Sequence, residues 1–325
     1  MSESQSEIFI TIADDVVPER ADKLLAELLP EHTRGSIQNW IRQGLVRQHG
    51  QPIVQKKKLM PGDMLTITIP EAQSIDHQPE DIPLNRVYED ADLLVINKLA
   101  GLVVHPGAGN PGATLLNGLL FHLPDNASLP RAGIVHRLDK GTTGLMVVAK
   151  SESARQSLTD RLSVRQMKRR YLAVVEGILV SGLTVERPIG RHRHDRLKMA
   201  VTSSGKPATT HFRVKQKFRR HTLIQAELET GRTHQIRVHL GYIGHTIVGD
   251  RTYGNRNHVP PHASQALIDC IQLYDHQALH AYSLTLTHPK LGETMRWQAD
   301  LPEDMENLLG LLEVDFRSAG DLPSI

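Results

Sequence analysis

The chain has 325 residues, of which 39% are apolar and 23% charged, and its net charge is +2 at pH 7. This length allows two domains with proper cores, and the composition excludes a mainly disordered protein. The single cysteine, Cys270, excludes a disulfide framework and a zinc site built from cysteines, and it is typical of a reducing compartment.

The N-terminal residues lack the pattern of a secretory signal, and no apolar run approaches the roughly 20 residues of a membrane-spanning helix. We therefore expect a cytoplasmic protein that does not contact a membrane. The small net charge hides two basic zones: residues 131–170 hold ten Lys or Arg against three Asp or Glu, and residues 190–220 hold ten against one. Such zones are typical of a polyanion-binding surface, although a solvated face with counter-charges nearby would give the same pattern.

Residues 17–70 have the pattern of a small separate unit. The apolar stripes of two short helices come first, at Leu24, Leu25, Leu28 and Leu29 and then at Ile37, Trp40 and Ile41. Pro30 ends the first helix, Thr33 is a suitable N-cap for the second, and Gly44 stands where a C-terminal glycine cap belongs. Short strand-like segments follow, and "MLTITIP" alternates as a half-buried strand does. The predicted order is α-α-β.

Residues 71–84 are polar, acidic and proline-containing, which indicates a linker. The remainder has mainly strand signals, at residues 93–98, 133–135, 145–149, 171–177, 222–229 and 282–288. Helical spacing occurs around Leu158 and around Leu308. Strands with few helices and no βαβ rhythm predict an α+β fold with a mixed or antiparallel sheet. We expect a first domain at 1–75, a linker at 76–85, a larger domain at 86–315 and a polar tail at 316–325.

The stretch "GIVHRLDKGTTGLMVVAK", residues 133–150, places one carboxylate, Asp139, between two apolar runs. Gly141 and Gly144 follow it, so a substrate can approach the backbone closely there. The neighbouring cations Arg137 and Lys140 favour the ionised carboxylate, which suits nucleophilic or electrostatic work better than proton donation. A salt-bridged surface turn would have the same pattern.

Two further stretches concentrate polar groups. "ETGRTHQIRVH", residues 229–239, follows a strand through a glycine turn and supplies a dense set of donors: Arg232, Thr233, His234, Gln235, Arg237 and His239. Donors without carboxylates suit an anion, either a phosphate or a partner Asp. In "KRRYLAVVEG", residues 168–177, Tyr171 follows three basic residues, and an aromatic ring beside a basic run can stack on an exposed base.

Two other stretches have only part of a ligand-binding pattern. In "RHRHDR", residues 191–196, three arginines would repel a divalent cation from the two histidines and the aspartate. "HPGAGNPG", residues 105–112, lacks the lysine and the strand-loop-helix context of a phosphate-binding loop. We expect no metal and no nucleotide cofactor.

These stretches, together with "VINKLAGLVVHPGAGN", resemble the signature blocks of the RluA-type pseudouridine synthases over nearly the whole chain. The resemblance implies a pseudouridine synthase catalytic domain, preceded by a unit similar to the S4 RNA-binding domain. Leu99 stands where the family usually has proline. In the S4-like unit one arginine of the usual pair is missing and Arg34 remains.

The resemblance also implies roles for single residues. Asp139 is the catalytic aspartate, Tyr171 stacks on the target uracil and is a candidate base, and Arg232 pairs with the aspartate. Arg137 helps to displace the flipped base. The other residues expected to contact RNA are His136, Lys140, Lys168, Arg169, Gly231, Thr233, His234, Gln235 and Arg237 and, in the first domain, Arg34 and Arg42.

The implied reaction is an isomerisation of uridine, in which the bond between ribose C1′ and uracil N1 breaks and C1′ joins C5. The base must first be turned out of the RNA structure. The reaction is redox-neutral, so no cofactor is expected. Three routes stay open for Asp139: attack on C1′, addition to C6 of the base, or assistance in the loss of the C2′ proton.

The implied substrate is uridine in the helix 69 stem-loop of 23S rRNA, on assembling large ribosomal subunits, and we expect a monomer. Three alternatives remain: a synthase of the same family that acts on transfer RNA or another rRNA site, a non-catalytic assembly factor, and a two-carboxylate glycoside hydrolase. An assembly factor would lack Asp139, Tyr171 or Arg232. A hydrolase would need a second acid opposite Asp139.

Overall fold

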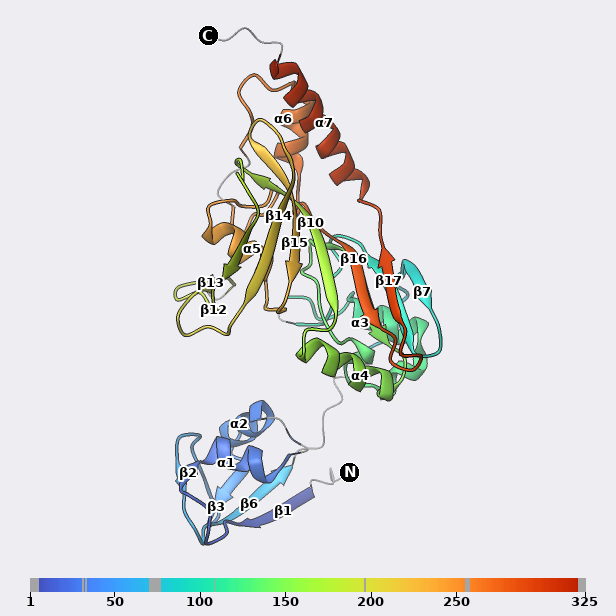
Figure 1. The fold of residues 1–325 in the computed structure, drawn as a ribbon. Helices are drawn as coiled ribbons and strands as arrows, with labels where there is room; N and C mark the ends of the chain where they lie inside the picture. Colours follow the sequence, from blue (N-terminus) through green and yellow to red (C-terminus); the bar gives the residue numbers. More distant parts are fainter. Residues whose placement is uncertain are drawn as a thin grey trace. The chain divides into compact units, whose positions relative to one another are not determined.

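The computed structural model describes residues 6–30, 32, 34–69, 77–107, 109–195, 197–254 and 258–320. The chain divides into two compact units, Met1–Asp76 and His77–Ile325, and the boundary falls within the acidic stretch 71–84 (Figure 1). Over the described ranges, no helix combines the length and the apolar character needed to cross a membrane.

The first unit packs two helices against a small sheet. Its elements are β1 (Ser6–Thr11), β2 (Glu19–Arg20), α1 (Ala21–Leu28), α2 (Arg34–Arg42), β3 (Val46–Gln48), β4 (Gln51–Pro52), β5 (Lys58–Leu59) and β6 (Met64–Ile69). Both predicted helices are present, Gly44 has the expected positive φ of 73°, and Thr33 lies outside the described residues. The α-α-β order was incomplete, because β1 pairs antiparallel with β6 in a sheet of order β1-β6-β3-β4.

A buried carboxylate joins the two helices of the first unit. The side chain of Asp22 has no exposed surface, and it accepts hydrogen bonds from Arg20, Arg34 and Gln38 at 3.0, 2.8 and 2.7 Å. Burial alone would raise the pKa of this carboxyl, but the three donors hold it well below its usual range. Arg34, which was expected to contact RNA, is therefore already paired within its own unit, with half of its side chain exposed.

The second unit is built on one large mixed sheet, as the α+β prediction requires. The strands of this unit are β7 (Arg86–Glu89), β8 (Leu93–Lys98), β9 (Thr143–Ala149), β10 (Lys168–Glu176), β11 (Leu183–Glu186), β12 (Ile189–Arg191), β13 (Met199–Val201), β14 (Thr209–Lys217), β15 (His221–Leu228), β16 (Leu279–Thr287) and β17 (Thr294–Gln298). The sheet order is β11-β14-β15-β10-β16-β9-β8-β7, and β17 pairs with β16. Within this sheet β9 and β16 are parallel and the other pairs are antiparallel.

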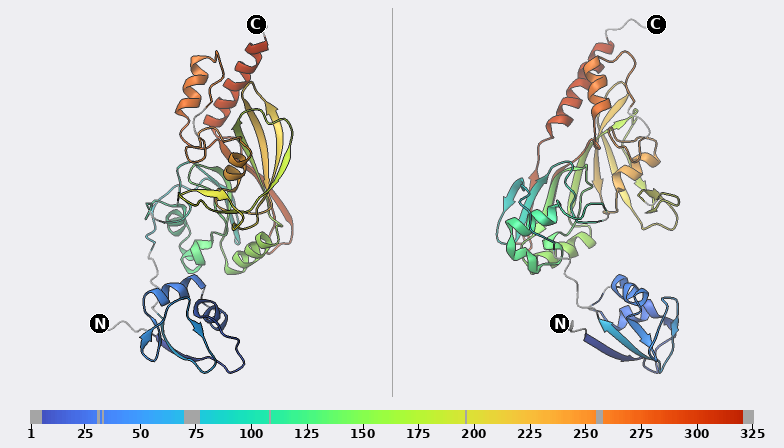
Figure 2. Two further views of the ribbon diagram at one scale, coloured as in Figure 1. Left: turned by 90° about the vertical axis from the view of Figure 1, so that its left-hand side faces the viewer. Right: turned by 180° about the vertical axis from the view of Figure 1, so that it is seen from behind.

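Helices cover the sheet and its ends. They are α3 (Leu115–His122), α4 (Glu152–Ser163), α5 (Gln235–Tyr242), α6 (Gln265–Leu273) and α7 (Glu303–Gly320), with 3₁₀ turns at Pro124–Ser128 and Pro130–Gly133. Figure 2 shows from two further sides that α6 and α7 lie together at one end of the sheet and α4 at the other. In β8, Leu94 and Ile96 join the core with α3, whereas Leu93 and Val95 join the core under α4. Burial on both faces explains the uninterrupted apolar runs of β8 and β9.

Five of the predicted strand signals correspond to β8, β9, β10, β15 and β16. No strand forms at 133–135: Arg131, Ala132 and Gly133 have φ values of 56°, 50° and 80° at the 3₁₀ turn, and Ile134 makes an isolated β-bridge to Val148. The polar tail expected from residue 316 was also wrong in part, because α7 continues to Gly320.

The second half of the expected linker belongs to the second unit. Asn117 of α3 donates from Nδ2 to the carbonyl of Gln78, and its own carbonyl accepts from the backbone N–H of Glu80. Ile82 lies against Gly118 of the same helix, where an added Cβ would approach the Ile82 side chain to 3.1 Å. The chain is therefore fixed to α3 before β7 begins.

Gly144 is constrained by the parallel pairing of β9 with β16. Its φ is 112°, and an added Cβ would lie 2.4 Å from the carbonyl oxygen of Ala281. Gly144→Ala should lower the free energy of unfolding by at least about 1–3 kcal/mol, because backbone strain adds to the clash. Denaturant unfolding measures this change.

Gly310→Ala is the matched control for this prediction. Gly310 is exposed on α7 and has open space around an added Cβ, so its replacement should leave stability unchanged or raise it by up to about 1 kcal/mol. An equal effect of the two substitutions would contradict the register of β9 against β16.

Candidate active site

A cavity of about 790 Å³ lies in the second unit. Its wall combines three stretches that the sequence set apart: residues 134–139, the β10 side chains of Arg169 and Tyr171, and residues 231–237. These segments are far apart along the chain and meet because β10 lies in the middle of the sheet order. A concave site with few convergent polar groups is the usual form of a small-molecule site.

Asp139 lies on the segment between the 3₁₀ turn and β9, with 14% of its side chain exposed. The backbone N–H of Thr142 donates to the Asp139 carbonyl at 3.0 Å, which closes a turn. Gly141 lies within this turn, and an added Cβ there would lie 2.5 Å from Oε1 of Gln277. The glycine is therefore required by close packing beside the carboxylate.

Lys98, at the end of β8, binds the backbone of the segment that carries Asp139. Its Nζ donates to the carbonyls of Leu99, Leu102 and Lys140 at 2.7, 3.0 and 3.1 Å. These three acceptors match the three donors of an ammonium group. Burial lowers the pKa of Lys98 and the Asp139 charge raises it, and the resulting pKa is about 7. This role was not predicted, because Lys98 is the last residue of an apolar strand.

The arginine that pairs with Asp139 is Arg237, and the expectation that Arg232 does so was wrong. Arg237 Nη1 lies 2.9 Å from Asp139 Oδ2, and its side chain is 7% exposed. Arg232 is exposed, and its Nε donates to the carbonyl of Pro207 at 3.1 Å. Both arginines line the cavity, but Arg232 lies in the turn before α5 and Arg237 lies in the first turn of the helix.

A second carboxylate, which the sequence did not indicate, fixes Arg237 from behind. Asp250 accepts from Arg237 Nε and Nη2 at 2.7 and 2.9 Å, and from the backbone N–H groups of Thr252 and Tyr253. Burial alone would lower the pKa of Arg237, but the two carboxylates raise it, so the guanidinium stays charged. Burial alone would raise the pKa of Asp250, but Arg237 lowers it. The three groups form a buried chain of ion pairs that ends at Asp139.

His234 is the other polar neighbour of Asp139. Its φ is 56°, and this left-handed residue directly precedes α5. The hydroxyl of Tyr253 accepts from the backbone N–H of Met199, so its own proton is available to His234 Nδ1 at 2.7 Å. The remaining nitrogen, Nε2, lies 4.0 Å from Asp139 Oδ1. Burial lowers the pKa of His234, which keeps the ring neutral near pH 7.

Tyr171 lies in the cavity wall and is 4% exposed. Burial raises the pKa of its hydroxyl, the Arg169 charge lowers it, and the Asp139 charge raises it. The phenol is therefore protonated at neutral pH. This state suits packing or stacking and does not supply a strong base.

His136 and Gln235 line the cavity but have structural hydrogen bonds. His136 Nε2 accepts from the backbone N–H of Val147 at 3.1 Å, and burial lowers the pKa of the ring to about 3, so it supplies no positive charge. Gln235 donates to the carbonyl of Thr209 and accepts from the backbone N–H of Arg232. Their contact with RNA, which the resemblance implied, stays a prediction.

The remaining residues expected to contact RNA fall into two groups. Those in the cavity wall are Arg137, Arg169, Gly231 and Thr233. Lys140 and Lys168 are exposed and lie outside that wall, and Arg34 and Arg42 belong to the first unit. For both groups, contact with RNA stays a prediction.

Three ionisable residues of the cavity wall were missed: His77, His105 and Arg131. Burial and the nearby charges of Arg131 and Arg137 together lower the pKa of His105 to about 4. The cavity thus has positive groups around it and one carboxylate inside it. His77 precedes β7 on the segment read as a linker, which explains why no site signal was recognised there.

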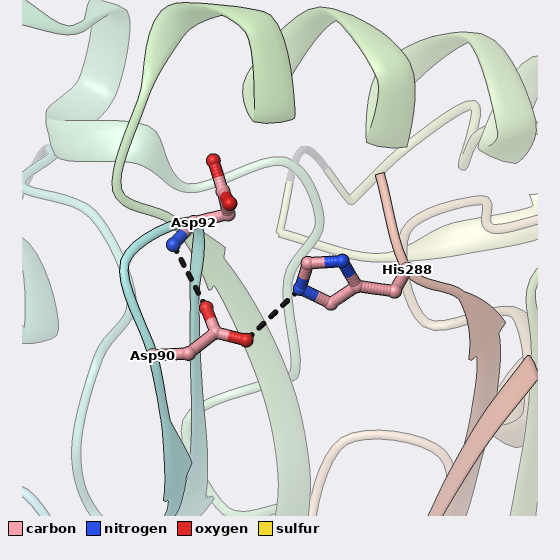
Figure 3. A group of neighbouring side chains, drawn as sticks. All are labelled: Asp90, Asp92 and His288. Atoms are coloured by element: carbon pink, nitrogen blue, oxygen red, sulfur yellow. Dashed lines mark hydrogen bonds and ion pairs between the residues drawn. The ribbon is translucent and has the colours of Figure 1, made fainter. Parts of the chain in front are cut away.

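Asp90, Asp92 and His288 form a cluster whose possible ligand atoms lie within 4.8 Å of one another (Figure 3). His288 Nδ1 accepts from two backbone N–H groups, so its proton is on Nε2, which donates to Asp90 Oδ2 at 2.9 Å. This leaves no Nε2 lone pair for a metal. Burial raises the pKa of Asp90, but hydrogen bonds from Tyr88, His288 and two backbone N–H groups lower it to about 2. The cluster therefore joins the turn before β8 to the end of β16.

Comparison with known proteins gives a consistent result. Residues 92–242 match the family model described as RNA pseudouridylate synthase. A protein of Yersinia pestis named Ribosomal large subunit pseudouridine synthase D is 48% identical over 318 residues, which are 98% of this chain and 98% of that protein. The proteins of the same name in Escherichia coli K12 and Pseudomonas aeruginosa are 46% identical over 312 residues and 48% identical over 297 residues. The first match covers 96% of this chain and 96% of the Escherichia coli protein. The second covers 91% of this chain and 93% of the Pseudomonas aeruginosa protein.

Solved structures extend the likeness to the fold. Human RNA Pseudouridylate Synthase Domain Containing 4 is 27% identical with a TM-score of 0.55, and the match covers 70% of this chain and 93% of that one. For Human RNA Pseudouridylate Synthase Domain Containing 1 the identity is 25%, the TM-score 0.51 and the coverage 75% and 97%. With close to half of its residues identical to those of these bacterial relatives over almost its whole length, the chain belongs to the RNA pseudouridylate synthase family.

Proposed function

We propose that this protein isomerises uridine to pseudouridine in the RNA of the large ribosomal subunit, with Asp139 as the catalytic group. The observation that carries this proposal is the Asp139 carboxylate, paired with Arg237 in the wall of a cavity of about 790 Å³. The relatives from Yersinia pestis, Escherichia coli and Pseudomonas aeruginosa are named for this activity on the large ribosomal subunit.

The size and charge of the cavity support a flipped nucleotide as the occupant. Its volume lies in the range of small-molecule sites, which suits a single nucleotide turned out of its stack. Arg137 is exposed and lines the cavity, so its side chain can occupy the space that the base vacates. The positive groups around the cavity would meet the RNA phosphates.

Inside the cavity, one carboxylate oxygen is engaged and the other is available. Oδ2 of Asp139 is bound by Arg237, whereas Oδ1 lies 4.0 Å from His234. An anion in this position can attack C1′, add to C6 or assist the loss of the C2′ proton. In each case the C1′–N1 bond breaks, the C1′–C5 bond forms, and a proton leaves C5 while N1 gains one. The balance needs no oxidant or reductant.

Tyr171 supports this chemistry as a platform for the base. It projects from β10 into the cavity wall, and its phenol is protonated at neutral pH because burial raises its pKa. A neutral aromatic ring suits stacking on uracil. We therefore assign Tyr171 to base stacking and leave the transfer of the C5 proton to a group of higher basicity.

We assign helix 69 of 23S rRNA as the target, from the resemblance of the signature blocks. Pseudouridines are mapped by carbodiimide primer extension across 23S rRNA and transfer RNA from cells with and without the gene. We expect loss of the signals in helix 69 and their return when the gene is restored. Loss at another site would overturn the substrate and keep the chemistry, whereas no loss at any site would reject the proposed function.

Arg237→Lys tests the pairing that the structure assigns. Lysine keeps the positive charge but lacks the planar fork that reaches Asp139 and Asp250 together. A misplaced Asp139 should lower the single-turnover rate of conversion on the order of 100-fold. Arg232→Lys, which keeps a cation at the cavity, should retain most of the rate. A larger loss in Arg232→Lys than in Arg237→Lys would restore the original assignment of the pair.

A further inference from the structure

Arg169 is a buried arginine without a counter-ion. It is 8% exposed, its Nε has no hydrogen-bond partner, and no ion pair to it is found among the described residues. The side chain lines the cavity, and its charge reaches both Tyr171 and His136, whose pKa values it lowers. A buried cation with no partner is costly, so its retention in a cavity wall indicates that an anion is supplied from outside.

The neighbouring arginines show the contrast. Arg165 pairs with Glu229, and Arg170 pairs with Glu227 of β15 at 2.7 Å. Arg170 points to the other side of β10, whereas Arg169 and Tyr171, two residues apart, both line the cavity. Carboxylates of the protein thus neutralise the two arginines outside the cavity wall and leave the one inside it free.

Gly231 makes room for this guanidinium. An added Cβ at Gly231 would lie 2.8 Å from Nη1 of Arg169, and Gly231 also lines the cavity. The backbone of Gly231 does not have a positive φ, so close approach to Arg169 is the reason for glycine here. The guanidinium therefore lies close against the turn at residues 230–231.

The substrate class decides what the anion is. Uracil and ribose are uncharged at neutral pH, and the anionic groups of RNA are its phosphates. Arginine binds a phosphate through paired N–H donors. Because Arg169 lies beside the tyrosine assigned to the flipped base, the phosphates within its reach are those bonded to that nucleotide.

We propose that Arg169 binds a backbone phosphate adjoining the flipped uridine and thereby fixes the nucleotide in the cavity. The inference rests on the proposed function and adds to it a subsite for one phosphate. Arg169 then acts in binding the RNA, and Asp139 acts in the chemistry.

The test uses the full-length protein and RNA stem-loops that carry the mapped target uridine. In each RNA, one phosphate near that uridine is replaced by an uncharged methylphosphonate, and the dissociation constant is measured. At one position adjoining the uridine, the replacement should weaken binding to the unchanged protein roughly 10-fold to 100-fold. The same replacement should not weaken binding to Arg169→Gln any further, because this variant already lacks the interaction between the guanidinium and that phosphate.

Arg170→Gln is the matched control, since it removes the same charge from the adjacent position and should respond to the methylphosphonate as the unchanged protein does. Arg169→Gln should also reduce the slope of log Kd against log salt by about one. Its free energy of unfolding should not fall, because an unpaired buried cation has been removed. Gly231→Ala, which displaces the guanidinium, should weaken the same phosphate contact.

Two results would overturn the phosphate subsite. In the first, every methylphosphonate weakens binding to the unchanged protein and to Arg169→Gln equally. In the second, Arg169→Gln has an unchanged Kd and slower conversion. The second result would assign Arg169 to the base instead. Conversion of uridine is measured in the same samples, so the two proposals fail separately. If the effects of Arg169→Gln and of one methylphosphonate on Kd are coupled but no uridine is converted, the proposed function is rejected and the subsite is kept. If the unchanged protein binds no RNA, both proposals are rejected.

Discussion

The guanidinium of Arg237 lies between two carboxylates, and the geometry of the cavity depends on this arrangement. Asp250 holds it through two hydrogen bonds from behind, and Asp139 accepts a third at the cavity. Loss of one member from a buried ion pair typically costs about 3–5 kcal/mol, because the remaining charge has no partner. The same interaction therefore stabilises the packing of α5 and aims the carboxylate, so stability and activity are coupled at this point.

The sheet delivers Asp139 to this pair from the other side. β9 begins just after Asp139, and the close contact of Gly144 with Ala281 fixes it against β16. Lys98, at the end of β8, binds the carbonyl of Lys140. A carboxylate on an irregular segment is thus held by three neighbouring elements, which is the kind of support that a precisely placed reactive group needs.

The sequence was informative where local pattern and tertiary environment agree. The apolar runs of β8 and β9 reflect strands buried on both faces, and their ends were predicted to within two residues. The segment 133–135 had the same apolar character, but the left-handed residues before it prevent a strand. Helix α5 was missed because Gln235, Arg237 and His239 are polar and yet buried, so the helix has no polar face to reveal its period.

The location of the candidate site was predictable from the sequence, but the arginine that pairs with Asp139 was not. Asp139, Tyr171 and the stretch 231–237 do meet in one cavity, as the signature blocks imply. The stretch holds two arginines, and the choice between them depends on where α5 begins, which a left-handed His234 sets. The residues next to Asp250 in the sequence do not indicate its role. That role arises from a contact with Arg237, which lies 13 residues earlier in α5.

The most direct test of this account compares the unchanged protein with Asp139→Asn on the same large-subunit rRNA. Asparagine keeps the shape of the side chain and removes its charge, and RNA binding and single-turnover conversion are measured together. We expect Asp139→Asn to bind the RNA nearly as tightly and to form no pseudouridine. Conversion at an appreciable rate by Asp139→Asn would contradict it, because the carboxylate that Arg237 holds would then not be the reacting group.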